Sequence, residues 1–367
     1  MRLKRGYTTG TCAALAVRAA LKMIFEQKII KKESIVTPDG IFVQTEIFFA
    51  EFEKDYAKCA VKKYSGDDPD VTDGIMIFAE VTLSGRRVII IEGGKGIGRV
   101  TKKGLYQNIG EAAINKVPRN MIAKNAEQIF EIYNYGGGAD IIISAPEGEK
   151  IAKRTFNPRL GIVGGISILG TSGIVEPMSE AALIETIKTE INMKKADKGD
   201  YIMIAPGNYG LDFIKRNYGV DLNCAVKCGN FVGEAIDLAN AAGFKGILLI
   251  GHIGKFVKLA GGIMNTHSKN ADGRMEIIAS NTAMVCGDIY VVRKIMECTT
   301  TDDAVRILKD TGICGEVMKK ITDKAVFYIN NRLKSNIETG IVMFSNIYGV
   351  LGESDNATEM FKHFTEG

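Results

Sequence analysis

The sequence predicts an α+β two-layer domain at residues 1–136, followed by a Rossmann-like α/β domain with a mainly parallel sheet at residues 137–265. Three observations predict this fold class. A length of 367 residues suggests two domains of roughly 150 residues each. In the first part, one helix precedes runs of β-branched and aromatic residues that are separated by turn residues. In the second part, strand-like runs alternate with helical segments, and a mostly helical region at 266–367 completes the chain.

The first part begins with a helix and continues with strands. Residues 11–25 join Thr11, a natural helix cap, to alanine-rich sequence of high helix propensity. We expect a largely antiparallel sheet after it, with this helix on one face, and further helices at 104–115 and 119–133. Turn residues bound the strand-like runs, which are 41–49, 56–64, 75–83 and 87–91.

Three consecutive glycines at 136–138 mark the expected domain boundary, because such a run is a hinge or turn. Beyond it, a short apolar run leads three times into a glycine-containing loop and a basic segment. Parallel strands would bring these loops to one edge of a sheet, where α/β proteins bind ligands. The three units are 141–154, 202–216 and 247–258. The sequence does not assign the last strand-like run, 340–345, to either domain.

Composition excludes several classes of protein. Lys and Arg number 47 and Asp and Glu 43, so a net charge of +4 is too balanced for a protein that coats nucleic acid. Seven scattered cysteines without a C-x-x-C pair indicate reduced thiols rather than a disulfide framework or a zinc site. No apolar run approaches the roughly 20 residues that span a bilayer. We therefore expect a cytoplasmic protein without a membrane partner, a nucleic-acid partner or a protein-bound metal.

Glycine is the departure from average composition, at 41 of 367 residues, and much of it lies in loops with polar neighbours. In Gly6–Cys12, threonine hydroxyls and a helix start could face an anion, although a capped helix entry has the same letters. At Glu92–Gly98, an E-x-G-x-G-x-G string follows a strand. This string suits S-adenosylmethionine or a dinucleotide, and a glycine-rich β-turn is the alternative.

Three further segments carry chemistry. Basic residues adjoin the glycine-rich stretch 161–173, an arrangement suited to an extended ligand with carboxylates or phosphates. The segment 251–268 holds two of the three histidines and two lysines three residues apart; such a histidine serves as acid, base or metal ligand, or is structural. Asp67–Asp70 is a turn or a cluster of catalytic carboxylates.

Seven segments, in order along nearly the whole chain, resemble the signatures of the CbiD family, the cobalt-precorrin-5B carbon-1 methyltransferases. They are Gly6–Ala14, Gly66–Thr72, Gly96–Lys102, Asn157–Ile162, Gly164–Thr171, Pro206–Gly210 and Gly254–Lys258 continuing to His267.

The resemblance implies an enzyme of anaerobic cobalamin biosynthesis that gives cobalt-precorrin-6A. It would transfer the methyl group of S-adenosylmethionine to a ring carbon of a tetrapyrrole whose cobalt belongs to the substrate. Because this substrate bears acetate and propionate groups, basic residues beside the loops would bind it. We expect substrate contacts from Thr8, Thr9, Thr11, Arg99, Lys102, Arg154, Arg159, Lys255 and Lys258. We expect donor contacts from Glu92, Gly94, Gly96, Gly98, Gly170 and Thr171.

Asp68 and His267 are the candidates for a base that adjusts the protonation of the macrocycle. Two other functions stay open at this point. One is a nucleotide-dependent oxidoreductase or kinase that uses Glu92–Gly98, and the other is a tetrapyrrole carrier without catalytic activity. A homo-oligomer is compatible with the sequence.

Overall fold

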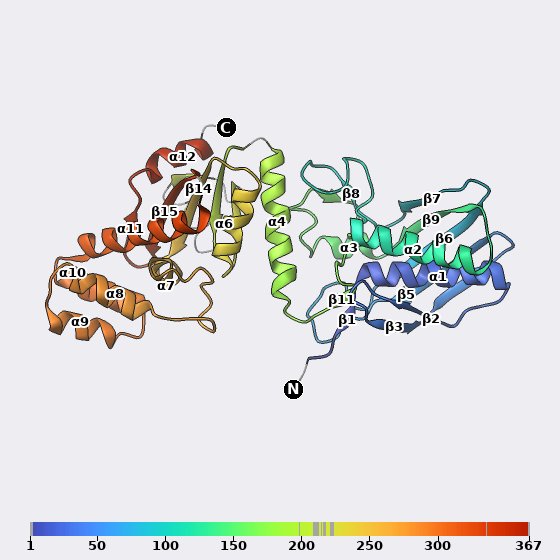
Figure 1. The fold of residues 1–367 in the computed structure, drawn as a ribbon, viewed down its shortest axis with the longest axis horizontal. Coiled ribbons are helices and arrows are strands. Elements are labelled where there is room, and N and C mark those ends of the chain that lie inside the picture. Colours follow the sequence, from blue (N-terminus) through green and yellow to red (C-terminus); the bar gives the residue numbers. More distant parts are fainter. Residues whose placement is uncertain are drawn as a thin grey trace. The chain divides into compact units, whose positions relative to one another are not determined.

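The computed structural model describes residues 3–197, 199–207, 213, 215, 218–220, 224–334 and 336–365. The chain divides into two compact units, Met1–Glu180 and Ala181–Gly367 (Figure 1). Each unit has its own sheet and its own hydrophobic core. Among the described residues, no helix is long and apolar enough to cross a membrane.

Unit 1 is built on a five-stranded sheet in the order β4-β5-β6-β9-β7. Its neighbours are antiparallel except β7 and β9, which run parallel. Alternate residues of the central strands are buried, as period-two alternation requires for a sheet with one covered face. The strands are β4 (Phe48–Phe52), β5 (Tyr56–Lys62), β6 (Met76–Ser84), β7 (Ile89–Gly93) and β9 (Gly138–Ser144).

Two helices cover this sheet, α1 (Thr9–Glu26) and α2 (Lys116–Ile132), and α1 packs on β5, β6 and α2 (Figure 1). Because α1 consists largely of alanine and other apolar residues, it is buried on nearly all sides. Three two-stranded pairs and a short helix complete the unit. They are β1 (Gly6–Tyr7) with β11 (Ile174–Val175), β2 (Lys32–Val36) with β3 (Phe42–Glu46), β8 (Arg99–Val100) with β10 (Ile162–Val163), and α3 (Gly148–Ala152).

Two expectations for this part of the chain are wrong. The glycines at 136–138 do not separate the compact units, because Gly138 begins β9, which lies between β6 and β7. A Cβ at Gly138 would lie 2.0 Å from the carbonyl oxygen of Val88, so glycine is needed there for close packing of the chain. The helix expected at 104–115 is absent from the described structure; turns and bridges occupy the segment, and Gly104 and Gly110 have φ of +95° and +90°.

Unit 2 contains a second five-stranded sheet in the order β13-β12-β14-β15-β16. Four strands are parallel and β16 is an antiparallel edge strand. The strands are β12 (Tyr201–Ala205), β13 (Ala225–Lys227), β14 (Gly246–His252), β15 (Glu338–Ser345) and β16 (Gly349–Glu353). The strand-like run at 340–345 thus joins this sheet. The run at 141–144 lies in the sheet of unit 1, so only the strands β12 and β14 lie parallel in one sheet as expected. Most of the loop and helix expected after β12, at 208–212, 214 and 216, lies outside the described residues.

Both faces of this parallel sheet are buried. Ile247 and Leu249 pack in one core cluster, and their neighbours Leu248 and Ile250 pack in another. Helices contribute to both clusters, so the strands read as continuous apolar runs. The helices are α4 (Glu180–Ala196), α6 (Val232–Ala241), α7 (Ile253–Phe256), the 3-10 helix η2 (Val257–Gly261), α8 (Arg274–Ala283), α9 (Ile289–Met296), α10 (Thr301–Asp310), α11 (Cys314–Leu333) and α12 (Ala357–Thr365).

Candidate functional site

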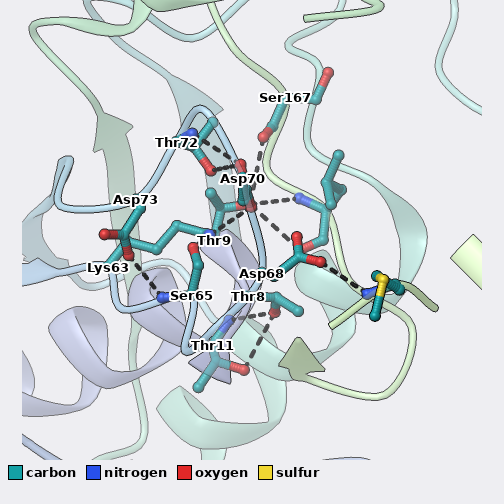
Figure 2. Close-up of polar contacts among 12 residues, drawn as sticks. Thr8, Thr9, Thr11, Lys63, Ser65, Asp68, Asp70, Thr72, Asp73 and Ser167 are labelled. Atoms are coloured by element: carbon teal, nitrogen blue, oxygen red, sulfur yellow. Dashed lines mark hydrogen bonds and ion pairs between the residues drawn. The ribbon is translucent and has the colours of Figure 1, made fainter. Parts of the chain in front are cut away.

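The amino-terminal end of α1 is bound tightly to the segment 167–173 (Figure 2). Thr8 is the N-cap, in place of the expected Thr11, and its Oγ1 accepts a hydrogen bond from the backbone N–H of Thr11 at 3.2 Å. Thr9 Oγ1 accepts from the N–H of Leu169 at 2.9 Å, and Thr11 Oγ1 donates to the carbonyl oxygen of Gly173 at 2.6 Å. All three threonines are buried. Their hydroxyls therefore hold the loop to the helix and make no surface for a ligand.

The loop between β5 and β6, residues 63–75, lies beside this helix end and is called the acidic loop because it contains four aspartates. It is organised around Lys63. The Lys63 side chain is buried, and its ammonium donates to Asp70 Oδ2 at 2.6 Å and to Ser65 Oγ at 2.5 Å (Figure 2). Asp70 Oδ1 accepts from the N–H and the hydroxyl of Thr72, and Asp73 Oδ1 accepts from the N–H of Ser65. Burial raises the pKa of Asp70, but the ammonium of Lys63 and the hydrogen bonds outweigh burial and lower the pKa below its usual value.

The acidic loop and the helix end are joined through β1. The N–H of Tyr7 donates to the carbonyl oxygen of Tyr64 at 2.8 Å, and the N–H of Asp67 donates to the carbonyl oxygen of Lys4 at 3.0 Å. Asp68 is half-buried, and its Oδ1 accepts from the N–H of Met178 at 3.0 Å. In the described part of the chain, Asp68 Oδ2 has no hydrogen-bond partner, which leaves one carboxylate oxygen able to accept a proton.

The other candidate base, His267, lies in unit 2. It is exposed, and its Nδ1 accepts from the N–H of Lys269 at 3.0 Å. Asp68 belongs to unit 1, so the two candidate bases lie in different compact units.

The glycines of the E-x-G-x-G-x-G segment pack closely against other backbone and side-chain atoms of the chain. A Cβ at Gly96, where φ is +76°, would lie 1.8 Å from the carbonyl oxygen of Ala145, and one at Gly98 would lie 2.9 Å from that of Gly165. A Cβ at Gly94 would lie 2.3 Å from Ser144 Oγ. Glycine is therefore needed at these positions for close packing of the loop, and the predicted contact of the loop with the methyl donor stays a prediction.

The other members of the predicted donor and substrate sets near this loop have varied surroundings. Glu92 is exposed, and its Oε1 accepts from Arg99 Nη1 at 2.7 Å, so Arg99 is engaged by a carboxylate. Arg99 Nη2 also donates to the carbonyl oxygen of Gly93. Thr171 is exposed, whereas a Cβ at Gly170 would collide with Thr8.

The predicted basic residues divide between the two units. In unit 1, Lys102, Arg154 and Arg159 are exposed. Pairing of β8 with β10 brings the segment of Lys102 beside that of Arg159, and the carbonyl oxygen of Gly161 accepts from both the N–H and the hydroxyl of Thr101, at 2.8 and 2.6 Å. The segments of Lys102 and Arg159 therefore lie side by side.

The two predicted lysines of unit 2 are less accessible. Lys258 is 2% exposed, and its ammonium donates to the carbonyl oxygens of Thr266 and Ala271, at 3.2 and 2.7 Å. It therefore ties down its own loop and cannot also reach a substrate from this position. Lys255 is half-buried, and burial lowers its pKa.

Sequence reasoning missed two cavities of unit 1, since each is lined by segments distant in the sequence. One, of about 360 Å³, lies at Tyr7 and the acidic loop; its walls are Tyr7, Thr45, Glu46, Phe48, Lys62, Lys63, Tyr64, Asp73 and Gly74. The other, of about 600 Å³, lies between the β2–β3 hairpin and the helices α1 and α2. Both volumes are in the range of small-molecule sites. Among the residues that the structure describes, no group of three or more His, Cys, Asp or Glu side chains could hold a metal ion.

Comparison with known proteins decides the family. Residues 1–177 match the family model CbiD, and residues 265–355 match the model described as CbiD, C-terminal domain. The chain is 48% identical to the cobalt-precorrin-5B C(1)-methyltransferase of Ruminiclostridium cellulolyticum, over 100% of this chain and 97% of the relative. The chain belongs to the CbiD family.

Two other CbiD proteins are similar over most of the chain. The cobalt-precorrin-5B C(1)-methyltransferase of Alkaliphilus metalliredigens is 40% identical over 98% of this CbiD chain and 95% of the relative. A solved crystal structure, the cobalamin biosynthesis protein CbiD of Archaeoglobus fulgidus, is 30% identical, with a TM-score of 0.40 over 73% of this chain and 83% of that chain. The networks of unit 1 described above lie within the residues that match the first CbiD model, except for Met178, which follows the last matched residue.

Proposed function

We propose that this chain transfers a methyl group to carbon 1 of cobalt-precorrin-5B and so forms cobalt-precorrin-6A in cobalamin biosynthesis. The observation that carries the proposal is full-length similarity to relatives of that name, at 48% identity over nearly the whole of both chains. The substrate is a polycarboxylate tetrapyrrole, and its cobalt enters with it.

We further propose S-adenosylmethionine as the methyl donor, because its sulfonium makes the methyl group a ready electrophile. A bond forms between that methyl and carbon 1 as the S–CH₃ bond breaks, and the electron pair stays on the sulfur of S-adenosylhomocysteine. The protein's task is then to align carbon and methyl and to exclude water. Asp68, with one oxygen unengaged, is our candidate in unit 1 for a proton acceptor; His267 is the candidate in unit 2.

The cavity of about 360 Å³ supports a cationic donor. Its walls contain the aromatic rings of Tyr7, Phe48 and Tyr64 and the carboxylates of Glu46 and Asp73. Aromatic faces and carboxylates attract a sulfonium, and the neighbouring ammonium of Lys63 is paired with Asp70. Glu92 and Thr171, whose side chains are exposed, are the alternative donor contacts.

We propose that Lys102, Arg154 and Arg159 bind carboxylates of the tetrapyrrole. Arginine suits this role because its planar guanidinium binds a carboxylate through two parallel hydrogen bonds. The neighbouring segments of Lys102 and Arg159 at β8 and β10 would let two arms of one macrocycle be held together.

We also propose a cytoplasmic location and a Rossmann-like description for unit 2. All seven cysteines are free thiols in the described structure, as is usual in a reducing compartment. The parallel strands β12 to β15, buried on both faces, support the second proposal.

The decisive test is mass spectrometry of cobalt-precorrin-5B after incubation with the full chain and S-adenosylmethionine. We expect one added methyl group and an equal amount of S-adenosylhomocysteine. Binding of the tetrapyrrole without a change in its mass would instead identify a carrier. Stronger thermal stabilisation by NAD(P)H or ATP than by S-adenosylmethionine would identify an oxidoreductase or kinase.

Two variants test the assigned contacts. Arg154→Ala should weaken tetrapyrrole binding by about fivefold and leave donor binding unchanged, whereas Arg293→Ala, an exposed arginine of α9, should change neither. Tyr64→Leu should reduce the preference for S-adenosylmethionine over S-adenosylhomocysteine, whose sulfur is uncharged, by about two- to tenfold. Loss of donor binding in Glu92→Gln, with the preference intact in Tyr64→Leu, would place the donor at the Glu92 loop.

A further inference from the structure

The larger cavity of unit 1 is a cleft of about 600 Å³ between a β-hairpin and two helices. One wall is the hairpin formed by β2 and β3, and the other is the surface of α1 and α2. None of the residues predicted from the sequence to bind a ligand lines it. Its walls are Arg18, Ser34, Ile35, Val36, Thr37, Pro38, Phe42, Val117, Asn120, Met121, Lys124, Asn125 and Gln128.

The cleft has an excess of positive charge. Its lining contains the cations Arg18 and Lys124 and no carboxylate. The nearby buried carboxylate, Glu33, serves two cations: Oε1 accepts from Lys22 Nζ at 3.0 Å and lies 3.4 Å from Arg18 Nε. One negative charge therefore faces Arg18 and Lys22 together, and Lys124 adds a further positive charge at the cleft.

Arg18 also has an unmet hydrogen-bonding capacity. Its Nη1 donates to Gln128 Oε1 at 3.1 Å, but Nε is buried and has no hydrogen-bond acceptor among the described residues. A buried donor without an acceptor is costly unless a ligand or water supplies one. Asn120, Lys124 and Gln128 follow each other at four-residue spacing, so they share one face of α2 with their donors toward the same cleft.

The hairpin supplies an apolar surface opposite these donors. Val36 and Phe42 are cross-strand partners, and each is 64% exposed. Val117 and Met121 continue the apolar lining on α2. Exposed large apolar side chains inside a cleft that also holds convergent donors are typical of a site for a ligand with an apolar body and polar arms.

The cleft is also connected to the helix end shown in Figure 2. Thr37 lines the cleft, and a Cβ at Gly173 would lie 2.8 Å from Thr37 Cβ, so the two residues are in close contact. Gly173 in turn accepts hydrogen bonds from the N–H of Thr8 and the hydroxyl of Thr11. Tyr7, the residue before Thr8, lines the smaller cavity. The two cavities thus border the same short segment of unit 1.

We propose that this cleft binds one edge of the tetrapyrrole, with acetate or propionate groups on Arg18 and Lys124 and the ring edge on Val36 and Phe42. The inference rests on the proposed function, which supplies a flat ligand with carboxylate arms. It assigns the substrate a second contact region, beyond the exposed cations at β8 and β10.

The test uses uroporphyrin, a stable flat tetrapyrrole with acetate and propionate arms, titrated into the full chain and followed by its fluorescence. Lys124→Glu should weaken binding by about tenfold at low salt and by less at high salt. The matched control is Lys324→Glu, which reverses an exposed lysine on α11 and should change affinity by less than about twofold. Equal affinities for the two variants would overturn the proposal.

A second pair of variants changes the free space in the cleft without changing its charge. Asn120 is exposed on α2, so Asn120→Trp should leave the fold intact, block the cleft and weaken uroporphyrin binding, whereas Asn120→Ala, which removes one donor and leaves the cleft open, should weaken binding less. Unchanged binding in Asn120→Trp would also overturn the proposal. Methyl transfer to cobalt-precorrin-5B with an unaltered KM in Lys124→Glu would reject the cleft but keep the function. Uroporphyrin binding that depends on the cleft, in a chain that transfers no methyl group, would keep the cleft but reject the proposed function.

Discussion

Replacing Lys63 by Met should destabilise unit 1, because the acidic loop is organised around this cation. The Lys63 side chain is 2% exposed and donates to Asp70 Oδ2 at 2.6 Å and to Ser65 Oγ at 2.5 Å. Methionine has a similar unbranched shape but no donor. The change leaves the carboxylate of Asp70 with the two hydrogen bonds from Thr72 and without its countercharge.

The size of the effect follows from the two lost contacts. A hydrogen bond to a charged group contributes about 1.5–3 kcal/mol, and removing one partner of a buried ion pair costs about 3–5 kcal/mol. The Asp70 side chain is 26% exposed, so water restores part of its hydration, and methionine avoids the cost of burying an ammonium. We therefore expect the free energy of unfolding at pH 7 to fall by about 2–3 kcal/mol.

The difference between the two proteins should shrink in acid. In the unmodified chain, the pKa of Asp70 is held below its usual value despite burial, because Lys63 and the hydrogen bonds favour the carboxylate. A carboxyl group with a lowered folded pKa stabilises the fold above its unfolded pKa of about 3.9, and this contribution is lost as the pH falls through the folded value. The cost of Lys63→Met should accordingly be full at pH 7 and smaller near pH 3.

Urea denaturation measures this difference, and peptide-resolved hydrogen exchange on β5 and β6 assigns it to unit 1. Circular dichroism is the suitable signal, since the chain has no tryptophan. The control is Lys62→Met, which changes the exposed neighbouring lysine at the end of β5 and should alter stability by less than about 0.5 kcal/mol. Equal stabilities of the Lys62 and Lys63 variants, or a cost that stays the same at both pH values, would refute the reasoning.

Two further outcomes follow from the packing of unit 1 and the burial of thiols. Gly96→Ala should cost more than about 3 kcal/mol, because its Cβ would lie 1.8 Å from a carbonyl oxygen, whereas Gly110→Ala, with φ of +90° and no atom within 4 Å, should cost about 1 kcal/mol; similar urea midpoints would contradict this. Exposed Cys286 should react with a thiol reagent in the folded chain, while Cys12 and Cys59, whose pKa burial raises to about 12, should react only on unfolding; fast labelling of Cys12 under native conditions would disprove it.

Local patterns in the sequence were sufficient for most of the elements. The alanine-rich segment expected as a helix at 11–25 is α1, Thr9–Glu26, and the expected strand at 75–83 is β6, Met76–Ser84. Both signals are local. The first is high helix propensity, and the second is a run of β-branched and aromatic residues in which apolar and polar residues partly alternate. The family was also predictable, because the motifs that carry the resemblance are contiguous in the chain and lie in a fixed order.

Long-range packing explains what was not predicted. The sequence does not distinguish a glycine at a domain boundary from one that packs against a neighbouring strand. It therefore predicts a hinge or turn at Gly138, which in the structure begins β9. Lys258 was interpreted as a surface cation, since the sequence does not show that the carbonyl oxygens of Thr266 and Ala271 surround its ammonium. In both cases the surroundings of the residue depend on a contact with another segment, and the position of that segment cannot be predicted from local sequence.

Long-range packing also explains part of the high glycine content. Glycine in these loops suggested backbone that touches a ligand, yet Gly96 and Gly98 lie against the backbone of Ala145 and Gly165. The space for a ligand is instead lined by side chains, such as Tyr64 in one cavity and Arg18 in the other. The glycines fix the conformation of the loops. Substitutions of side chains in the cavities are therefore a more direct test of ligand binding than substitutions of the glycines.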